Sequence, residues 1–459
     1  MGIFAKSDPE KDTQIMLGDP KVAIFTMVVP FLISLIMNQI NMLADVAWCS
    51  GMGSEQVSAI QTVTPIYWVI FDVGLGIGLG CNVLIARRIG AGDRAGAQNI
   101  IAQGLVVSLI IALLLAPVLY LMIAPMVSWM GAESLTELSV AYLTPILICN
   151  VFQVLSPTLS GFLRGEGAAK RSNFALILGT LANIILDPIL IYGLELGVLG
   201  AGIATAVACV VSSIVMIYYY VSGSTTLRMS LKGYRFQTSE VKEIMYIGLP
   251  KMAEMFLMDT MDAFNRVFLI QCGGVDAVTL FTIPFRWVIL AVMIPNSFSL
   301  SLTPVSSANI GAKRPDKSVR GFKICVKASL ITTAVMVVAY LIFAEFLIIP
   351  FIQSETMIVL KSELIDILRI ETLLIPALGL TFVCNSMLQS MRKPMVALFI
   401  TFIKNIGTTA IFFVLCDTSV DIMVSGMVVA TYISAVICIL LTRVAIKEMM
   451  IGFKAPSPA

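Results

Sequence analysis

Acidic and amide side chains recur at helical spacing inside two apolar stretches of this chain. The first stretch places polar residues at positions i, i+4, i+7 and i+11, namely Ser34, Asn38, Asn41 and Asp45. The second stretch places Asn183 and Asp187 at i and i+4, so each set shares one helix face. No Lys or Arg lies close in sequence within either stretch. Such oxygen-rich sites favour a proton or a small hard cation such as Na⁺.

These positions also have plainer interpretations. The Ser and Asn side chains could hold helices together through hydrogen bonds, and Asp187 could lie solvated near the membrane surface. Thr205 and Tyr142 could complete an ion site, although either residue alone is typical of helix packing. Residues predicted to line or support a substrate pocket in this half are Asn38, Asn41, Tyr142 and Gln153.

A second group of charged residues lies in the apolar stretch that begins near residue 242. Its members are Glu254, Asp259, Asp262, Asn265 and Arg266. Asp262 and Arg266 are four residues apart and could form an ion pair, and Arg286 in the next stretch could pair with any of the acids. These charged residues could form a structural charge network or could bind the substrate, and the sequence leaves both alternatives open.

Composition indicates that this chemistry takes place in a membrane. The 459 residues are 58% hydrophobic and only 13% charged, with a mean hydropathy of +0.95, whereas a soluble domain is about 25% charged. The absence of histidine excludes histidine bases and histidine metal sites. The nine cysteines form no CxxC motif, so neither a zinc site nor a disulfide framework is expected. A net charge of +2 gives no indication of nucleic-acid binding.

The elements that position these residues are predicted to be transmembrane helices, each of about 20 mostly apolar residues. Twelve stretches qualify: 21–48, 56–86, 98–124, 137–163, 172–194, 198–222, 242–271, 276–311, 320–350, 357–391, 394–416 and 421–446. Basic residues gather in alternate loops, such as Arg87 with Arg88 and Lys313 with Arg314. The positive-inside rule therefore places these loops and both termini in the cytoplasm.

An internal repeat divides the chain. Pro30 opens the first stretch and Pro250 the seventh, and Ile89-Gly90-Ala91 recurs as Ile310-Gly311-Ala312. Asn183 and Lys404-Asn405 fall in corresponding fifth stretches. We expect lobes at 1–222 and 241–459 joined by a cytoplasmic linker at 223–240, related by an axis along the membrane normal, with a substrate cavity between them.

Two motifs resemble those of proteins with other functions. The alternating glycines from Gly74 to Gly80 resemble a phosphate loop, but they lie in an apolar stretch without a following Lys-Ser/Thr, so close helix packing is expected. Asp259-Thr-Met-Asp262 resembles a magnesium-diphosphate motif of prenyl transferases, but it occurs once. An intramembrane prenyl-diphosphate enzyme is therefore a remote alternative, and a flippase for lipid-linked sugars is the alternative within transport.

Several motifs together resemble the multidrug and toxic compound extrusion (MATE) transporters over essentially the whole chain. They are Pro30 with Asp45, the loop Ile89-Gly90-Ala91-Gly92-Asp93, Leu163-Arg164-Gly165-Glu166-Gly167, Asn183-Ile-Ile-Leu-Asp187-Pro188, the glycine-alanine run from Gly197 to Ala206, and Ile310-Gly311-Ala312. The resemblance implies an all-α membrane protein with twelve transmembrane helices in two pseudo-symmetric six-helix bundles forming a V. It also implies export of organic, often cationic, compounds in exchange for H⁺ or Na⁺ by alternating access.

The resemblance also assigns residues, particularly through the prokaryotic DNA-damage-inducible-type branch. The cation site of that branch falls on Asp45, Asn183, Asp187 and Thr205, with Tyr142 beside it, and Pro30 matches a proline where the first helix bends. A second branch places its carboxylates on spans 7 and 10, where Asp259 and either Glu371 or Asn385 lie. Secondary candidates in the second half are therefore Glu254, Asp259, Asp262, Arg266 and Arg286.

The chain is accordingly expected to be a transporter and not an enzyme, located in the cell membrane as a multi-pass monomer. It should need no cofactor beyond the coupling ion, and no metal beyond Na⁺ at Asp45 and Asp187. Its partners should be membrane lipid and a small organic substrate, without nucleic acid.

Overall fold

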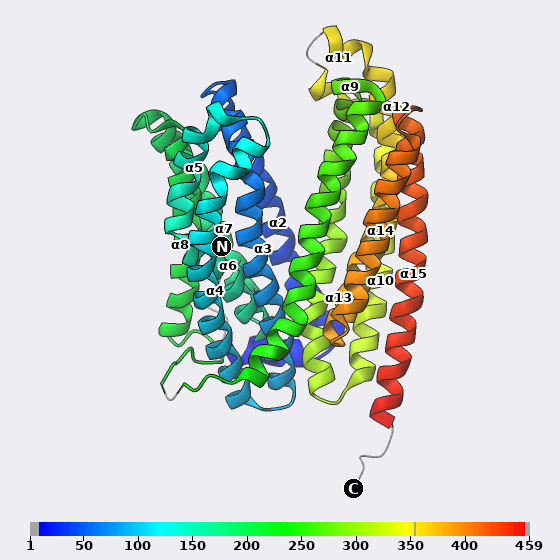
Figure 1. The fold of residues 1–459 in the computed structure, drawn as a ribbon. Helices are drawn as coiled ribbons and strands as arrows, with labels where there is room; N and C mark the ends of the chain where they lie inside the picture. Colours follow the sequence, from blue (N-terminus) through cyan, green and yellow to red (C-terminus); the bar gives the residue numbers. More distant parts are fainter. Residues whose placement is uncertain (1–8, 233, 353–354, 455–459) are drawn as a thin grey trace. The chain divides into compact units, whose positions relative to one another are not determined.

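The computed structural model describes residues 9–232, 234–352 and 355–454, and in these residues the regular structure is helical (Figure 1). The helices of the first half are α1 (Pro9–Leu17), α2 (Pro20–Ser50), α3 (Ser54–Gly90), α4 (Arg94–Trp129), α5 (Thr136–Ile148), α6 (Asn150–Gly165), α7 (Ala169–Pro188) and α8 (Gly197–Val221). Short turns are η2 (Glu133–Leu135) and the π-helical η3 (Ile189–Gly193).

The second half begins with α9 (Thr238–Gly311) and α10 (Pro315–Ile348). It continues through η4 (Ile349–Phe351), α11 (Glu355–Val359), α12 (Lys361–Thr372), α13 (Leu374–Ser390), α14 (Pro394–Leu415) and α15 (Val420–Lys454). Large apolar side chains such as Leu114 and Leu121 on α4 are 65% and 73% exposed, as expected of surfaces that face lipid.

Ten helices of the described chain are long and apolar enough to cross a membrane, and the pair α5 and α6, bent by 55°, makes an eleventh. One of the ten is α9, whose 74 residues would greatly exceed the roughly 30 Å hydrocarbon core if it were straight. It is broken at Gly273 and Gly274, where Gly274 has φ 65°. Each arm of α9 is longer than a span requires, so the predicted twelve spans follow when both arms are counted.

The helices pack as two compact units. Unit 1 comprises the chain up to Met252 together with Ser307–Lys313, and unit 2 comprises Ala253–Ser306 and the chain from Arg314 onward. These units are defined by packing, whereas the predicted lobes rest on a sequence repeat, so the lobe boundaries at 222 and 241 stay a prediction.

Unit 1 depends on glycines that let helix backbones touch. A Cβ on Gly74 or Gly78 would lie 2.6 or 2.5 Å from carbonyl oxygens of α6, and one on Gly76 or Gly80 would lie 2.7 or 2.4 Å from carbonyl oxygens of α9. Residues four apart share a helix face, so the alternating run packs one face on α6 and another on α9. The expectation of close helix packing is confirmed.

The repeated Ile-Gly-Ala motif has a related role in unit 1. A Cβ on Gly90 would lie 1.9 Å from the Ala308 carbonyl oxygen, and one on Gly311 would lie 2.1 Å from the Arg87 carbonyl oxygen. The two copies of the motif therefore pack reciprocally, each glycine against the helix that carries the other.

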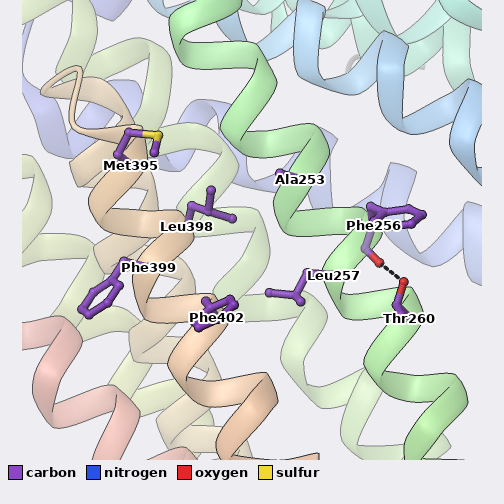
Figure 2. Close-up of a pocket in the computed structure, with 8 residues that line it drawn as sticks. All are labelled: Ala253, Phe256, Leu257, Thr260, Met395, Leu398, Phe399 and Phe402. Carbon is purple, nitrogen blue, oxygen red and sulfur yellow. Dashed lines mark hydrogen bonds between the residues drawn. The ribbon is translucent and has the colours of Figure 1, made fainter.

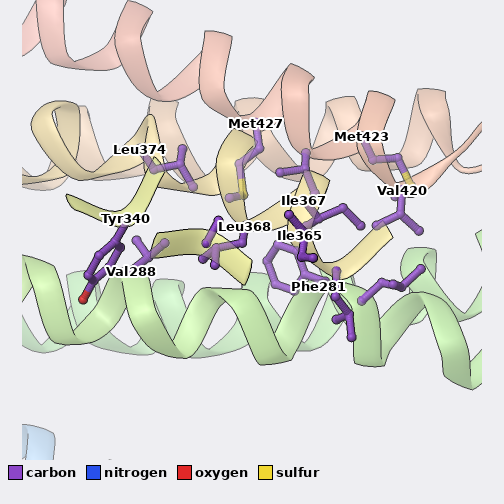
Figure 3. Close-up of a cluster of buried hydrophobic side chains, with 14 of the residues drawn as sticks. Phe281, Val288, Tyr340, Ile365, Ile367, Leu368, Leu374, Val420, Met423 and Met427 are labelled. Atoms are coloured by element: carbon purple, nitrogen blue, oxygen red, sulfur yellow. The ribbon is translucent and has the colours of Figure 1, made fainter. Parts of the chain in front are cut away.

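The core of unit 2 is an apolar cluster formed by α9, α10, α12, α13, α14 and α15. Figure 3 shows Ile367 and Leu368 of α12 between Phe281 of α9 and Met427 of α15. Phe281 also packs edge-to-face against Phe412, with ring centroids 6.0 Å apart. Apolar side-chain packing therefore joins six helices of unit 2.

A buried carboxyl outside the membrane spans fixes the start of unit 1. Glu166 follows α6, and its Oε2 accepts a hydrogen bond of 3.1 Å from the Leu227 amide, while its carbonyl oxygen accepts one of 3.1 Å from the Thr13 hydroxyl of α1. Burial raises the pKa of the Glu166 carboxyl to about 7, although the Leu227 amide, Tyr220 and Arg171 act in the opposite direction.

Replacing Gly78 by Ala should lower stability by about 1–3 kcal/mol, because the added methyl would overlap α6. Gly407→Ala is the matched control, since a Cβ there meets no atom within 4 Å. Thermal unfolding in detergent measures both variants. Equal midpoints for the two would contradict the packing role of the glycine run.

Glu166 should make stability fall as the pH rises from about 4.5 to about 7, because the folded state holds a proton there that the unfolded state releases near its ordinary pKa of 4.5. Glu166→Gln should flatten this part of the stability profile, measured by thermal unfolding at a series of pH values. A variant profile with the original slope would show that another group is responsible.

Candidate functional site

The candidate site lies in unit 1, where four helices bring polar side chains together. Asp45 is in the last two turns of α2, Asn183 and Asp187 are on α7, Tyr142 is on α5 and Thr205 is on α8. α2 packs on α7, α7 on α8, and α5 on α8. The predicted residues from separate parts of the sequence therefore converge on one side of the bundle.

Close packing positions the side chains from α5 and α8. A Cβ on Gly202 would lie 2.1 Å from the Tyr142 carbonyl oxygen, so only glycine lets the two helices approach this closely. Thr205 comes one turn later and forms a side-chain hydrogen bond with Tyr142. The Tyr142 side chain is 8% exposed.

The α7 helix changes geometry at Asp187. Pro188 has no amide hydrogen, so the helical hydrogen bond to the Ile184 carbonyl is missing, and the chain continues as the π-helical η3. Such turns are frequent at functional sites. The Tyr192 hydroxyl donates a hydrogen bond to the Trp48 carbonyl, which joins η3 to the end of α2 beside Asp45.

The Asp45 and Asp187 carboxyl groups lie close enough to interact directly. Asn183 donates a hydrogen bond of 3.4 Å from Nδ2 to Asp187 Oδ1. The Asp187 side chain is 1% exposed, and its Oδ2 is buried without a hydrogen-bond partner among the described residues. No ion pair joins either carboxyl to a Lys or Arg of the described chain.

Two adjacent carboxylates without a counter-charge are unfavourable in a poorly hydrated site. A proton or a monovalent cation between them removes the repulsion and satisfies the buried oxygen. The residues therefore have the chemistry that a small cation with oxygen ligands requires. The described residues contain no group of three or more His, Cys, Asp or Glu that could hold a metal ion, at this site or elsewhere.

Two further residues at this site escaped the sequence analysis. Tyr67 of α3 lies within electrostatic range of Asp45 and Tyr142, and Cys49 lies within range of both carboxyls. Cys49 follows Asp45 by four residues, so helical spacing could have indicated it. Tyr67 lies in an apolar stretch without a polar pattern, and no sequence signal marks it.

Of the four predicted supporting residues, Tyr142 lies at the site and the other three are dispersed. Asn38 is exposed, Asn41 is partly buried with an unpartnered Oδ1, and Gln153 is fully buried with no partner for either amide atom among the described residues. Among the described residues, no hydrogen bond is shown between any of these three residues and the carboxyl pair. Pro30 is buried inside α2, fifteen residues before Asp45.

The second-half candidates form separate features in unit 2. Arg266 Nη2 lies 3.0 Å from Asp262 Oδ2, which is the expected i, i+4 pair, although both side chains are more than half exposed. Asp259 and Arg286 are exposed, and Arg286 forms no ion pair with a described residue. Glu254 is 6% exposed and accepts hydrogen bonds from Thr401 (3.1 Å) and Asn385 (3.5 Å). Glu371 is fully buried, and neither carboxyl oxygen has a partner among the described residues.

Comparison with known proteins gives consistent matches. The sequence profile of the MatE family matches residues 30–189 and 250–415. The multidrug export protein MepA of Staphylococcus saprophyticus is 26% identical over 396 residues, which cover 84% of this chain and 85% of that protein.

Solved structures match over almost the whole chain. The crystal structure of a MATE protein in complex with MaL6 has a TM-score of 0.92 and 28% identity, covering 96% of this chain and 99% of that chain. The structure of a MATE protein in the bent conformation has a TM-score of 0.91 and 27% identity, covering 97% and 99%. The all-helical membrane fold expected from the sequence is confirmed by these matches.

Proposed function

This chain belongs to the MatE family, which consists of transporters and not enzymes, and from that membership we propose that Asp45 and Asp187 bind the H⁺ or Na⁺ that drives its export of organic compounds. Multidrug export is the function of this multi-pass membrane protein. The observation that supports the coupling site is the direct contact of two carboxyls without a basic partner.

The coupling follows from the charge of this pair. With no ion bound, the site carries negative charge, and α2 and α7 are driven apart at this level. Binding of H⁺ or Na⁺ removes the repulsion, and Asn183 orients Asp187 Oδ1 toward the ion. An ion that binds one conformation more tightly than the other shifts the balance between them, and the exported compound is linked reciprocally.

The movement that we propose is a bend of α2 at Pro30. A proline inside a helix leaves the carbonyl four residues earlier without its donor, so the helix can bend there at low cost. Bending would move α2 against α7 and shrink the substrate pocket predicted in the first half, which expels the substrate. A related MATE protein adopts a bent conformation, which supports the proposal.

The remaining assignments concern the setting of this site. We infer that the chain belongs to the DNA-damage-inducible-type branch, because that branch carries its cation site on residues matching Asp45, Asn183, Asp187 and Thr205. The basic loops place both termini on the cytoplasmic side of the cell membrane. A monomer is sufficient, since all ligands of the proposed ion come from unit 1.

Asp45→Asn and Asp187→Asn should each reduce ion-driven efflux to the level of protein-free liposomes. The reason is that an amide has no negative charge for H⁺ or Na⁺ to neutralise. Efflux of a fluorescent organic cation from proteoliposomes measures this, with the Na⁺ and pH gradients imposed separately. The gradient that drives wild-type efflux identifies the ion.

Two matched controls accompany this experiment. Asp366→Asn alters an exposed carboxylate paired with Arg369 and should leave efflux unchanged. Asp259→Asn tests the alternative site in unit 2 and should also transport normally. Full ion-driven efflux by both first-unit variants, or its loss only in Asp259→Asn, would refute the proposed site.

A further inference from the structure

The two arms of α2 on either side of Pro30 are packed very differently. Every buried residue of the helix lies in its proximal arm, between Pro20 and Phe31, and no residue of its distal arm, 32–50, is buried. The guanidinium group of Arg164 also stacks over the Phe31 ring, 4.9 Å from the ring centroid, which anchors the proximal arm further. Asp45 therefore lies on the part of α2 that side-chain packing secures least.

Two hydrogen-bonded links join the distal arm of α2 to other helices of the described chain. One is the contact of Asp45 with Asp187. The other is the hydrogen bond that the Tyr192 hydroxyl of η3 donates to the Trp48 carbonyl, three residues after Asp45. The Trp48 carbonyl lies in the last turn of α2, where a helix leaves carbonyl groups without their usual donors, and the Gly51 amide reaches it at 3.3 Å. The Tyr192 hydroxyl thus satisfies an acceptor close to the ion site.

The backbone that carries Tyr192 is firmly placed. The preceding residue, Ile191, is only 3% exposed, and a Cβ on Gly200 of α8 would lie 2.7 Å from the Leu190 carbonyl oxygen. The backbones of η3 and α8 therefore approach closely. On the other side, a Cβ on Gly51 would overlap the Tyr192 hydroxyl and lie 3.2 Å from the ring carbon that bears it. Tyr192 thus reaches from a fixed base to the end of α2.

Many hydroxyl groups in this chain serve only their own helix. Figure 2 shows one at the apolar pocket between α9 and α14, where the Thr260 hydroxyl donates a hydrogen bond of 2.7 Å to the Phe256 carbonyl four residues earlier. Thr144 of α5 donates to the Val140 carbonyl in the same way, at 2.6 Å. Tyr192 instead crosses from η3 to α2, so its hydrogen bond exists only while the distal arm is in place.

We propose that Tyr192 is a positioning residue that holds the distal arm of α2 against η3. Its hydrogen bond limits how far Asp45 moves from Asp187 when the site is empty and the two carboxylates repel each other. An ion then finds its ligands already close together, which raises its affinity. This role rests on the coupling function proposed above, and it adds a determinant of ion affinity that is not itself an ion ligand.

Hydrogen exchange of the full-length protein in detergent tests the contact itself. Tyr192→Phe removes the hydroxyl and keeps the ring, so amide exchange in a peptide covering residues 43–52 should become about fivefold faster, the effect of losing one hydrogen bond. Tyr120→Phe is the matched control and should change nothing, since Tyr120 is 50% exposed and its hydroxyl has no hydrogen-bond partner among the described residues. Equal exchange in Tyr192→Phe and the wild type would overturn the proposal.

Ion dependence separates positioning of the site from simple capping of the helix. Efflux of the fluorescent cation ethidium from proteoliposomes is titrated with Na⁺ at fixed pH and with H⁺ in the absence of Na⁺. In Tyr192→Phe the concentration of the driving ion at half-maximal efflux should rise about fivefold, with an unchanged maximal rate. If that ion is H⁺, the midpoint moves to lower pH. Faster exchange with an unchanged half-maximal concentration would show that the hydroxyl only caps α2, and would overturn the positioning role.

A second variant disturbs the same contact from the side of α2. Gly51→Ala places a methyl group on the Tyr192 hydroxyl and should therefore act like Tyr192→Phe in both measurements. Its backbone conformation (φ −72°, ψ −13°) suits alanine, which would otherwise favour the folded chain. The double variant Gly51→Ala/Tyr192→Phe should be no worse than either single variant, because loss of the hydroxyl makes room for the methyl. Additive effects would indicate two independent defects and would overturn the shared contact.

The exchange measurement also separates this proposal from that of the coupling site. Tyr192→Phe should accelerate exchange in the Asp45→Asn background as well, because the acceptor is the Trp48 backbone. Full ion-driven efflux in Asp45→Asn, together with faster exchange in Tyr192→Phe, would refute the coupling site and leave the Tyr192 contact intact. Loss of ion-driven efflux in Asp45→Asn, together with unchanged exchange in Tyr192→Phe, would refute the role of Tyr192 alone.

Discussion

Two carboxyl groups that touch in a largely apolar helix bundle form the constraint on which the rest of this structure depends. Burying one ionised carboxylate is costly, and burying two side by side without a basic partner is more so. A proton or cation that accompanies Asp45 and Asp187, as proposed, would remove this cost. The cost of the empty site and its relief on ion binding are what make the pair suitable for coupling.

Much of the surrounding architecture brings these two groups together. Gly202 lets α5 approach α8, the break at Pro188 ends α7 just after Asp187, and Tyr192 joins the following turn to α2. Unit 2 buries an acid as well, but there Thr401 and Asn385 donate hydrogen bonds to the Glu254 carboxyl. The buried carboxyls of the two units thus differ, because Glu254 accepts two side-chain hydrogen bonds whereas Asp187 Oδ2 has no partner among the described residues.

The sequence was sufficient to predict the helical spans, because apolar length and helical spacing mark them directly. Spacing of four placed Asn183 beside Asp187, and the twelve apolar stretches correspond to the observed helices once α9 is divided at Gly273 and Gly274. The packing of alternating glycines on two different helices was foreseen only in general terms. The place of Tyr67 at the site could not be foreseen, since it depends on which helices become neighbours in space.

The claim that Asp45 and Asp187 share one cation is tested most directly by infrared difference spectroscopy of the purified protein without Na⁺. The account predicts the signal of a protonated carboxyl that is absent from both Asp45→Asn and Asp187→Asn, because removal of either partner ends the sharing. A protonated-carboxyl signal that persists unchanged in both variants would contradict it.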